Sequence, residues 1–271
     1  MQIAVLIPAA GAGRRYVEAA GAEGPRSKLD EDLGGRPVLH RTIEAFTNYD
    51  APGRTLSPIV VAGPHGEQEF AEFKMRHGDK LSILGVQLVR GGETHRWQTV
   101  RAALEAIPGS ATHVAIHDAA RPCVGTELLD RVFDAAERFR AVVPALDVTD
   151  TIKCVAEEPV PDEGADPLAA ILGAPKKGPG LRSVEQTLDR ARVVAVQTPQ
   201  VFAADLIRRA YAQSDLTSTD DAGLVERLGE RVVVVEGDAA NIKITRPLDL
   251  KVARALLGLK GPTERATHKR F

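Results

Sequence analysis

The sequence predicts an α/β fold with a mostly parallel sheet and helices on both faces. Short apolar runs rich in branched residues alternate along the chain with stretches of helical spacing. Strands buried on both faces of a parallel sheet read as continuous apolar runs, and alternation of strands with helices favours right-handed crossovers. The 271 residues are 44% hydrophobic and 27% charged, an ordinary globular composition that excludes a disordered chain.

Seven apolar runs are the predicted strands. The first, Ile3–Ile7, ends in Pro-Ala-Ala-Gly, which is typical of a buried strand that enters a tight loop. Six further runs have the same character: Ile59–Ala62, Val86–Val89, His113–Ile116, Ala141–Pro144, Val193–Val196 and Arg231–Val235. Ligands of such sheets bind beyond the carboxyl ends of the strands, so the residues that follow these runs are the first candidates for a site.

Helices are predicted where apolar residues recur on one helical face. A helix around Glu127–Arg138 is expected on the same grounds. The two clearest faces consist of Val38, Leu39, Thr42, Ile43 and Phe46, and of Val100, Ala103, Leu104 and Ile107.

One segment interrupts this alternation. Residues Glu157–Arg182 are rich in Pro, Gly, Ala and charge and have no sustained periodicity, which is unusual inside a compact domain. We interpret the segment as part of an arm over about 149–192, inserted in a single domain of residues 1–260. Residues 261–271 are a polar tail.

Charge and cysteine content exclude several classes of protein. The net charge of -2 argues against broad nucleic-acid binding, and no apolar run reaches the roughly 18 residues of a membrane span. The apolar stretch at the N-terminus is too short for a signal peptide, so a soluble cytoplasmic protein is expected. Cys123 and Cys154 fit neither a zinc spacing nor a disulfide framework and are expected to be reduced small hydrophobes.

The first candidate motif is PAAGAGRR (8–15), directly after the first strand. Gly11 and Gly13 let the backbone approach a phosphate closely, and Arg14, Arg15 and the later Lys28 supply cations that suit a triphosphate. The motif has no third glycine for a dinucleotide fingerprint and no Gly-Lys-Ser/Thr for a P-loop. An ordinary βα turn with a solvated basic flank remains the alternative.

The second motif is HDAARP (117–122), at the end of the strand His113–Ile116. A carboxylate at the end of a strand can hold Mg²⁺ while the small residues after it leave space for a nucleotide. The alternatives are that Asp118 caps the helix around Glu127–Arg138 or pairs with Arg121.

The third motif is the loop GGETHRWQTV (91–100), which opens a helix. Its glycines permit close approach, and Arg96 and Thr99 offer hydrogen bonds to a base or ribose. Trp97 can stack on a base, although core packing is the commoner role of a tryptophan. His95 has no metal spacing around it and is expected at the surface.

The fourth motif is GDAANIKITRP (237–247). Lys243 lies between Ile242 and Ile244 in an apparent alternating strand, so its side chain is expected to point into a site and meet an anion. A solvent-facing lysine on an edge strand is the alternative. Residues Thr219–Asp221 are typical of a helix N-cap, with a metal role less favoured.

Taken together and in this order, these motifs resemble the 2-C-methyl-D-erythritol 4-phosphate cytidylyltransferases of the non-mevalonate isoprenoid pathway. Further matching segments are GRPVLHRTIEAF (35–46), DTIK (150–153), QTPQVF (197–202) and STDDA (218–222). The resemblance implies a Rossmann-like nucleotidyltransferase fold with a protruding dimerisation arm. It also implies a homodimer that uses CTP, Mg²⁺ and a sugar-alcohol phosphate and releases pyrophosphate, without nucleic acid or membrane.

The resemblance also implies roles for individual residues. Charge around the α-phosphate would be stabilised by Arg15, Lys28 and Lys243, and Asp118 would carry the metal. The nucleotide would be held by Pro8, Ala9, Ala10, Gly11, Ala12, Gly13, Gly91, Arg96, Thr99, Asp118 and Ala119. The sugar phosphate would be held by Thr151, Arg190 and Thr198, with Arg121 supporting its pocket or orienting Asp118.

The chain departs from the family pattern at three places. The stretch Tyr16–Ser27 before Lys28 is longer than usual, the loop before Arg96 has an extra residue, and Ala240 replaces a residue that is often acidic. Two alternatives to the methylerythritol phosphate reaction therefore remain: transfer to ribitol 5-phosphate or another sugar phosphate, and an inactive nucleotide-binding homologue.

Overall fold

The computed structural model describes residues 1–11, 13–20, 27–160 and 181–259, without the side chains of Arg14, Arg15 and Ala20. Ala12, the tail 261–271 and residues 161–180 of the predicted insertion lie outside this description. Contacts divide the chain into two units, one of Met1–Ala145 with Val196–Phe271 and one of Leu146–Ala195. The predicted arm falls within the bounds of the second unit.

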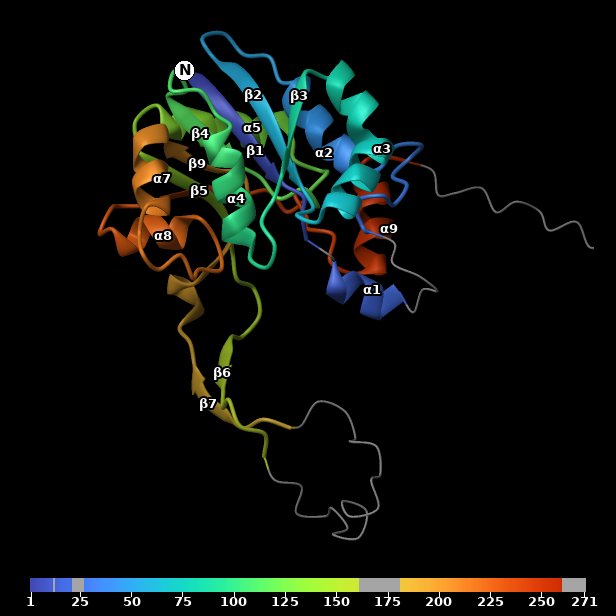
Figure 1. Cartoon of the computed structure of the whole chain (residues 1–271). Helices are drawn as coiled ribbons and strands as arrows, with labels where there is room; N and C mark the ends of the chain where they lie inside the picture. The colour runs from blue at the N-terminus through green and yellow to red at the C-terminus, as the bar shows by residue number, and fades with distance from the viewer. Residues whose placement is uncertain (12, 21–26, 161–180, 260–271) are drawn as a thin grey trace, which may run out of the picture. The chain divides into compact units, whose positions relative to one another are not determined.

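The first unit is built on a mostly parallel sheet with the order β10-β5-β9-β4-β1-β2-β3 (Figure 1). All neighbours along this order are parallel except β9, which runs antiparallel to both β4 and β5. The strands are β1 (Gln2–Pro8), β2 (Thr55–Gly63), β3 (Val86–Arg90), β4 (His113–Ile116), β5 (Ala141–Asp147), β9 (Gln200–Ala203) and β10 (Val233–Glu236), with β8 (Val194–Val196) pairing with β5 off this order.

Each of the seven predicted apolar runs overlaps a strand, so the predicted fold class is confirmed. Two of them are not buried in the predicted way. Val194–Val196 is exposed throughout, because β8 lies off the main order where the chain passes from one unit to the other. Val233–Glu236 alternates between half-buried and exposed residues because β10 is an edge strand. The strand β9, which overlaps the QTPQVF segment, has no apolar run long enough to predict it.

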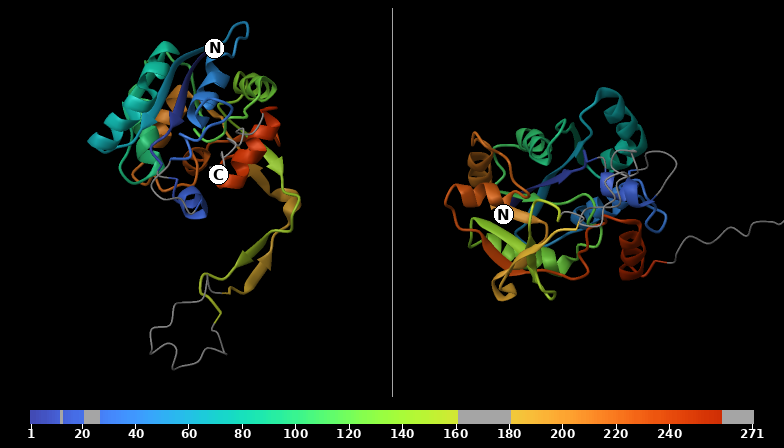
Figure 2. Two further views of the ribbon diagram at one scale, coloured as in Figure 1. Left: turned by 90° about the vertical axis from the view of Figure 1, so that its right-hand side faces the viewer. Right: turned by 90° about the horizontal axis from the view of Figure 1, so that it is seen from below.

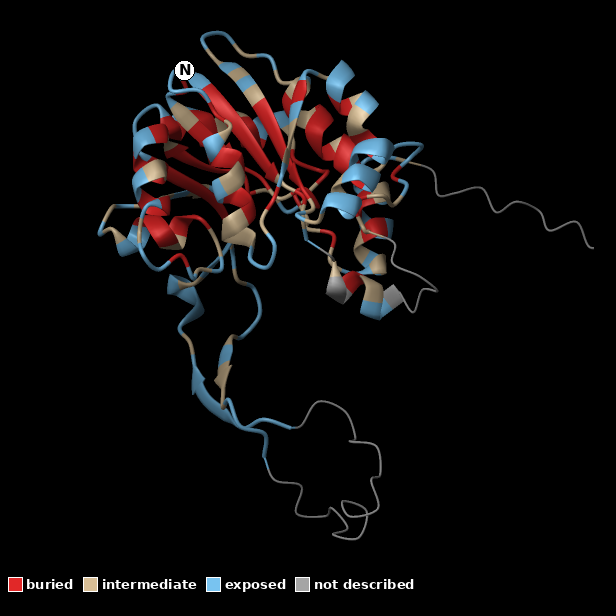
Figure 3. Cartoon of the chain, viewed as in Figure 1, coloured by how far each residue is buried: buried red, intermediate tan, exposed pale blue. Residues whose placement is uncertain are grey.

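Helices cover both faces of the sheet and bury two separate apolar clusters (Figures 1 and 2). The cluster on one face takes residues from α1 (Arg14–Ala20), α2 (Val38–Thr47), α3 (Glu67–Ile83), α5 (Thr126–Ala136) and α9 (Pro247–Leu256). The other takes residues from α4 (Arg96–Glu105), α7 (Ala204–Tyr211) and α8 (Ala222–Arg227). Figure 3 shows that buried residues follow the central strands and the helix faces turned toward them.

The predicted helical faces are confirmed. In α2, the five predicted residues Val38, Leu39, Thr42, Ile43 and Phe46 are all buried. In α4, Val100, Ala103 and Leu104 are buried, and Ile107 is buried just beyond the helix. The spacing of three and four residues therefore located the face that each helix turns to the sheet.

The second unit contains a two-stranded antiparallel sheet of β6 (Lys153–Val155) and β7 (Val184–Thr187), followed by the short 3₁₀ helix Arg190–Arg192. Lys153 Nζ donates to Thr187 Oγ1 across the pair at 2.5 Å. Cys154 of β6 is half-buried and free, and Cys123 of the first unit is buried and free, as predicted. Every helix in the described part of the chain is too short or too polar to cross a lipid bilayer.

Candidate active site

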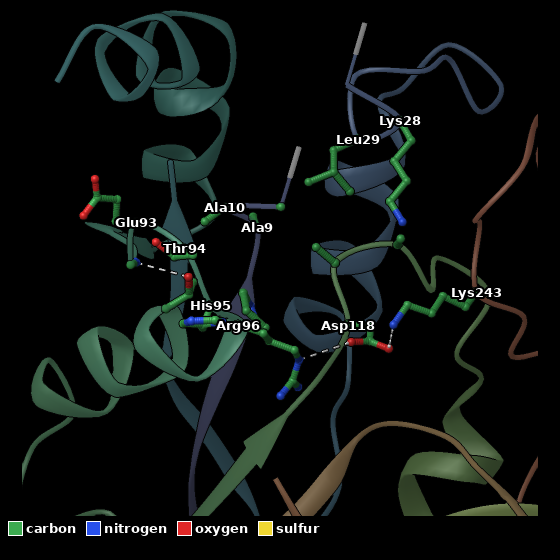
Figure 4. Close-up of a pocket in the computed structure, with 16 residues that line it drawn as sticks. Ala9, Ala10, Lys28, Leu29, Glu93, Thr94, His95, Arg96, Asp118 and Lys243 are labelled. Carbon is green, nitrogen blue, oxygen red and sulfur yellow. Dashed lines mark hydrogen bonds and ion pairs between the residues drawn. The ribbon is translucent and has the colours of Figure 1, made fainter. Parts of the chain in front are cut away.

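A cavity of about 460 Å³ opens at the carboxyl ends of β1 and β4 (Figure 4). All four sequence motifs contribute to its wall, although they are far apart along the chain. The lining residues are 8–11, 28–29, 92–96, 99, 118–120 and 243. The cavity therefore lies where the strand ends predict a site.

Asp118 is the ionised centre of the cavity wall. Its Oδ2 lies 2.9 Å from Lys243 Nζ and 3.2 Å from Arg121 Nε, and its Oδ1 lies 3.9 Å from Arg96 Nε. Burial alone would raise the pKa of Asp118, but Lys243, Arg96 and Arg121 together lower it well below the usual range. These ion pairs keep Asp118 ionised in a cavity that the cations Lys28, Arg96 and Lys243 also line, an arrangement that suits a polyanion.

The contacts of Asp118 distinguish the two alternatives to a metal role, which are capping of the following helix and pairing with Arg121. Asp118 pairs with Arg121, whose Nη1 also donates to the Asn241 carbonyl at 2.7 Å. The alternative in which Asp118 caps the following helix is wrong, because α5 begins after Gly125. Arg121 thus orients the carboxylate from behind the wall.

Lys243 projects from a segment that is not a strand. The residues around it are assigned to no strand, so the predicted strand is wrong at this place. The predicted alternation nevertheless holds, since Ile244 is fully buried and its N–H donates to the Ala120 carbonyl at 2.8 Å, while Lys243 faces Asp118. That backbone hydrogen bond ties the lysine to the loop that carries Asp118.

Lys28 enters the cavity from a second, separate segment (Figure 4). Its Nζ donates to the Ile244 carbonyl at 2.8 Å, one residue beyond Lys243. The long stretch before Lys28 therefore does not keep the ammonium away from the cavity. The side chain of Arg15, the third predicted catalytic cation, lies outside the described residues; its backbone belongs to α1.

Arg96 is held from behind by a buried carboxylate that the sequence analysis did not single out for this role. Its Nη1 and Nη2 donate to Asp221 Oδ1 and Oδ2 at 2.9 and 2.7 Å, and Tyr211 Oη donates to the same carboxylate at 2.5 Å. Burial alone would lower the pKa of Arg96, but Asp221 raises it. The arginine therefore stays charged in a fixed orientation at the cavity.

The predicted helix N-cap at Thr219–Asp221 is confirmed in position, because Asp221 is the N-cap residue of α8. Asp221 precedes α8 but makes no capping hydrogen bond with its side chain. Asp220 Oδ1 instead accepts from the Gly223 N–H at 3.0 Å, near the start of that helix. The adjacent aspartates have different tasks, which local sequence does not distinguish.

Glycines allow the third motif to approach β2. The Gly91 N–H donates to the Gly63 carbonyl at 2.9 Å, and a Cβ on Gly91 would lie 2.5 Å from that oxygen. Thr99 Oγ1 is buried and accepts from the Gly92 N–H at 3.1 Å. Gly92 rather than Gly91 lines the cavity.

Trp97 and His95, the other candidates of this loop, take the commoner of the roles considered for them: core packing and surface exposure. Trp97 packs against the apolar cluster of α4, α7 and α8, and the Arg101 guanidinium lies 5.3 Å from its ring centroid. Core packing of Trp97 is thus confirmed. His95 is exposed, as predicted, at the rim of the cavity.

Thr198 is buried next to Asp118. Its Oγ1 accepts from the Asp118 N–H at 3.1 Å and lies 3.2 Å from Nδ1 of the fully buried His117. Asn241 Nδ2 donates to the Thr198 carbonyl at 2.8 Å. QTPQVF therefore supports HDAARP from the neighbouring strand β9. Thr151 and Arg190 belong to the second unit, where Arg190 donates to the Thr149 carbonyl.

Asp118 is the candidate metal ligand among the described residues that line the cavity. Within the described residues, no three His, Cys, Asp or Glu side chains gather into a metal site. Asp118 fits the pattern of Mg²⁺ sites that use one or two carboxylates together with substrate phosphates, because it is ionised and its Oδ1 lies beyond hydrogen-bond distance of Arg96.

The fold and this cavity define a nucleotidyltransferase of the Rossmann-like class. The family model of 2-C-methyl-D-erythritol 4-phosphate cytidylyltransferase matches residues 3–166 and 162–259. The chain belongs to this family, whose enzymes use CTP, a sugar phosphate and a divalent metal ion.

Individual relatives agree over nearly the whole chain. The enzyme of that name from Rhodococcus jostii is 40% identical over 256 residues, covering 94% of this chain and 95% of its own. The Bacteroides fragilis enzyme of the same name is 38% identical, and the match covers 93% of this chain and 98% of that enzyme. The crystal structure of the Thermus thermophilus enzyme has a TM-score of 0.68 at 32% identity, covering 96% of this chain and all of the other.

Proposed function

We propose that this protein transfers a cytidylyl group from CTP to 2-C-methyl-D-erythritol 4-phosphate, with Mg²⁺, and releases pyrophosphate. The observation that carries the proposal is the convergence of Asp118, Lys243, Arg96 and Lys28 on one cavity beside the glycine-rich loop 8–11. Membership of the 2-C-methyl-D-erythritol 4-phosphate cytidylyltransferase family supports methylerythritol phosphate as the acceptor.

In this mechanism, an oxygen of the acceptor phosphate attacks the α-phosphorus of CTP while the bond to pyrophosphate breaks. No covalent intermediate with the protein is needed, so the protein contributes position and charge. Lys28 and Lys243 stabilise the negative charge around the α-phosphate, with Arg15 as the third predicted cation. The backbone of 8–11 supports the nucleotide.

Asp118 would hold the metal ion together with phosphate oxygens of the nucleotide. When bound, the ion supplies positive charge that polarises the phosphates. Lys243 and Arg121 hold the carboxylate ionised and oriented for this task. Lys243 Nζ lies 2.9 Å from Asp118 Oδ2, so a triphosphate that binds beside one of these two side chains would also meet the other.

Other assignments complete the proposal. Arg96 and Thr99 would face the cytosine side of the nucleotide, and the role expected of Gly91 would fall to its neighbour Gly92, which lines the cavity. Thr151, Arg190 and Thr198 would bind the acceptor, although the hydrogen bonds of Thr198 are to His117, Asp118 and Asn241. The homodimer formed through the arm and the cytoplasmic location stay predictions.

The direct test is pyrophosphate release by the purified chain with CTP and Mg²⁺. Methylerythritol phosphate and ribitol 5-phosphate are supplied in separate reactions. Release with the first alone is expected. Release with ribitol phosphate alone would overturn the proposed acceptor, and silence with both would overturn the proposed reaction.

The same assay tests the site. Lys243→Ala should lower turnover by about 10²–10³-fold, the usual loss when one preorganised charge-stabilising donor is removed. Lys251→Ala removes an equal charge from the exposed face of α9 and should leave turnover unchanged. Asp118→Asn should abolish metal-dependent turnover with the fold intact. Near-normal turnover in either site variant would remove that residue from the mechanism.

A further inference from the structure

A buried chain of polar groups lies behind Lys28, outside the cavity. His40 of α2 and His77 of α3 are 8% and 2% exposed, and His40 Nε2 lies 3.0 Å from His77 Nδ1. His77 Nε2 lies 2.8 Å from Asp30 Oδ1. Two imidazoles and a carboxylate therefore connect two helices to a loop.

One arrangement of protons satisfies both contacts. His77 Nε2–H donates to Asp30, and His77 Nδ1 accepts from His40 Nε2–H. Burial, the largest cause, lowers the pKa of His40, which favours its neutral form. The chain thus has a direction that ends on the Asp30 carboxylate.

Asp30 belongs to the turn that carries Lys28. Its N–H donates to the Ser27 carbonyl at 2.9 Å, and the buried Leu29 between the two residues accepts from the Leu39 N–H at 3.2 Å. These bonds attach the turn to α2, while the His77–Asp30 contact attaches it to α3. Lys28 therefore projects into the cavity from a turn held on two sides.

We propose that Asp30 and His77, with His40 behind them, are positioning residues that fix the turn 27–30 and hence the Lys28 ammonium at the cavity. This inference rests on the proposed function, in which Lys28 stabilises charge at the α-phosphate. Buried polar groups are costly unless fully paired, and a paired chain defines one arrangement. A displacement of about 1 Å at a reacting group can cost about 10²-fold in rate.

Charged side chains around the chain supply the controls. Arg76 Nε of α3 lies 3.6 Å from Asp30 Oδ2, and this arginine is half-exposed. From α2, Glu44 Oε1 lies 4.0 Å from Lys80 Nζ of α3, and its Oε2 bonds Arg36 at 2.5 Å. Asp32 is exposed two residues beyond Asp30.

The experiment substitutes Asp30 rather than the histidines, because loss of a buried imidazole between two helices can unfold the protein. Asp30→Ala should lower kcat at saturating CTP by about 10-fold or more. Asp30→Asn should restore most of the loss, since its amide oxygen still accepts from His77. Asp32→Ala, which removes an equal charge from the same loop, and Arg76→Ala should both resemble the wild type.

A double-mutant cycle then tests whether Asp30 acts through Lys28. In a Lys28→Met background, Asp30→Ala should cause little further loss of kcat, because its effect requires the ammonium. Equal losses in both backgrounds, or an Asp30→Ala variant with wild-type kcat, would overturn the inference.

Hydrogen exchange separates this inference from the proposed function, because it needs no substrate. Backbone amides of residues 28–33 should exchange faster in Asp30→Ala than in the wild type or Asp32→Ala. Unchanged exchange would overturn the inference even in an active enzyme. If the wild type itself releases no pyrophosphate, the proposed function fails and the exchange data still decide whether Asp30 and His77 hold the turn.

Discussion

His117 illustrates how single residues are partnered beside the cavity. Its ring is fully buried, with Nε2 3.1 Å from the Arg121 carbonyl and Nδ1 3.2 Å from Thr198 Oγ1. With the proton on Nε2, the neutral imidazole satisfies both contacts. Burial, the largest effect, lowers the pKa of His117 to about 4. The loop that carries Asp118 is therefore built around an uncharged histidine.

This lowered pKa predicts a loss of stability in acid. An unfolded histidine titrates near pH 6.5, so between pH 6.5 and about 4 the unfolded chain takes up a proton that folded His117 does not. The free energy of unfolding should fall over this window by up to about 3 kcal/mol from His117, and this contribution should be constant above it. Urea denaturation at a series of pH values measures the slope.

The control for this prediction is a pair of variants. His117→Gln should be less stable at pH 7 but should show a shallower slope between pH 6.5 and 4, while His95→Gln, at an exposed position, should keep the wild-type slope. His40 and His113, whose pKa values burial also lowers, retain part of the slope in both variants. An unchanged slope in His117→Gln would contradict the assignment.

At the scale of elements, the end of β3 closes tightly on the end of β2. Gly91 follows β3, and its Cα lies so near Gly63 that an added Cβ would also meet Thr99 Cγ2 at 2.9 Å and Ala10 Cβ at 3.0 Å. The glycine thus permits the third motif to pack against the first. The close contact is between backbone atoms, which cannot rotate away.

Gly91→Ala should therefore destabilise the protein by about 1–3 kcal/mol, as overpacking does in a close-packed interior. Gly109→Ala is the matched control, because no atom of the described chain lies within 4 Å of a Cβ there and its φ is not positive. The midpoints of urea unfolding compare the two. Equal midpoints would show that β2 and β3 can separate without cost.

Elements differ in how well the sequence predicts them. Continuous apolar runs and helical spacing locate the buried strands and faces because both report burial directly. β9 was missed because its four residues begin with Gln200 and follow the motif Gln-Thr-Pro. The segment around Lys243 alternates like a strand but lacks a partner, and partners are not encoded in local periodicity.

The residues of the site also differ in how well the sequence predicts their positions. Asp118 and the glycine-rich loop 8–11 could be placed together because strand ends of a parallel sheet meet at one edge. Lys28 and Lys243 follow no strand end and were placed beside them by the family resemblance. The Arg96–Asp221 pair could not be predicted, because 125 residues separate its members and Asp221 locally resembles an N-cap. The His40–His77–Asp30 chain was also missed, since each member looks like an ordinary surface residue until α2 and α3 pack together.

At the scale of the whole molecule, the sheet separates two apolar clusters that can be perturbed independently. Ile43 lies fully buried in the cluster of α2, α3 and α5, and Ile207 lies fully buried in the cluster of α4, α7 and α8. Their side chains are on opposite faces of the sheet, so the packing around one does not include the other.

Ile43→Val and Ile207→Val should each lower the free energy of unfolding by about 0.5–1.5 kcal/mol. The double variant should show their sum within about 0.5 kcal/mol, because distant sites without shared partners are additive. Ile83→Val, at a position that is 79% exposed, is the control and should have almost no effect. Chemical denaturation compares these four variants with the wild type, and a clear deviation from the sum would show that the two faces are coupled.

The excursion of the chain between β5 and β9 begins and ends at one point of the first unit. The Gln197 N–H donates to the Pro144 carbonyl at 2.7 Å, so the two ends of the segment Leu146–Ala195 are closed on each other by the sheet itself. Within this segment β6 and β7 pair with each other, so they close the chain between them independently of the first unit. The entropy of closing a flexible loop rises by only about 0.6 kcal/mol for each doubling of its length, so residues added between β6 and β7 should cost the fold little and leave the large sheet unchanged.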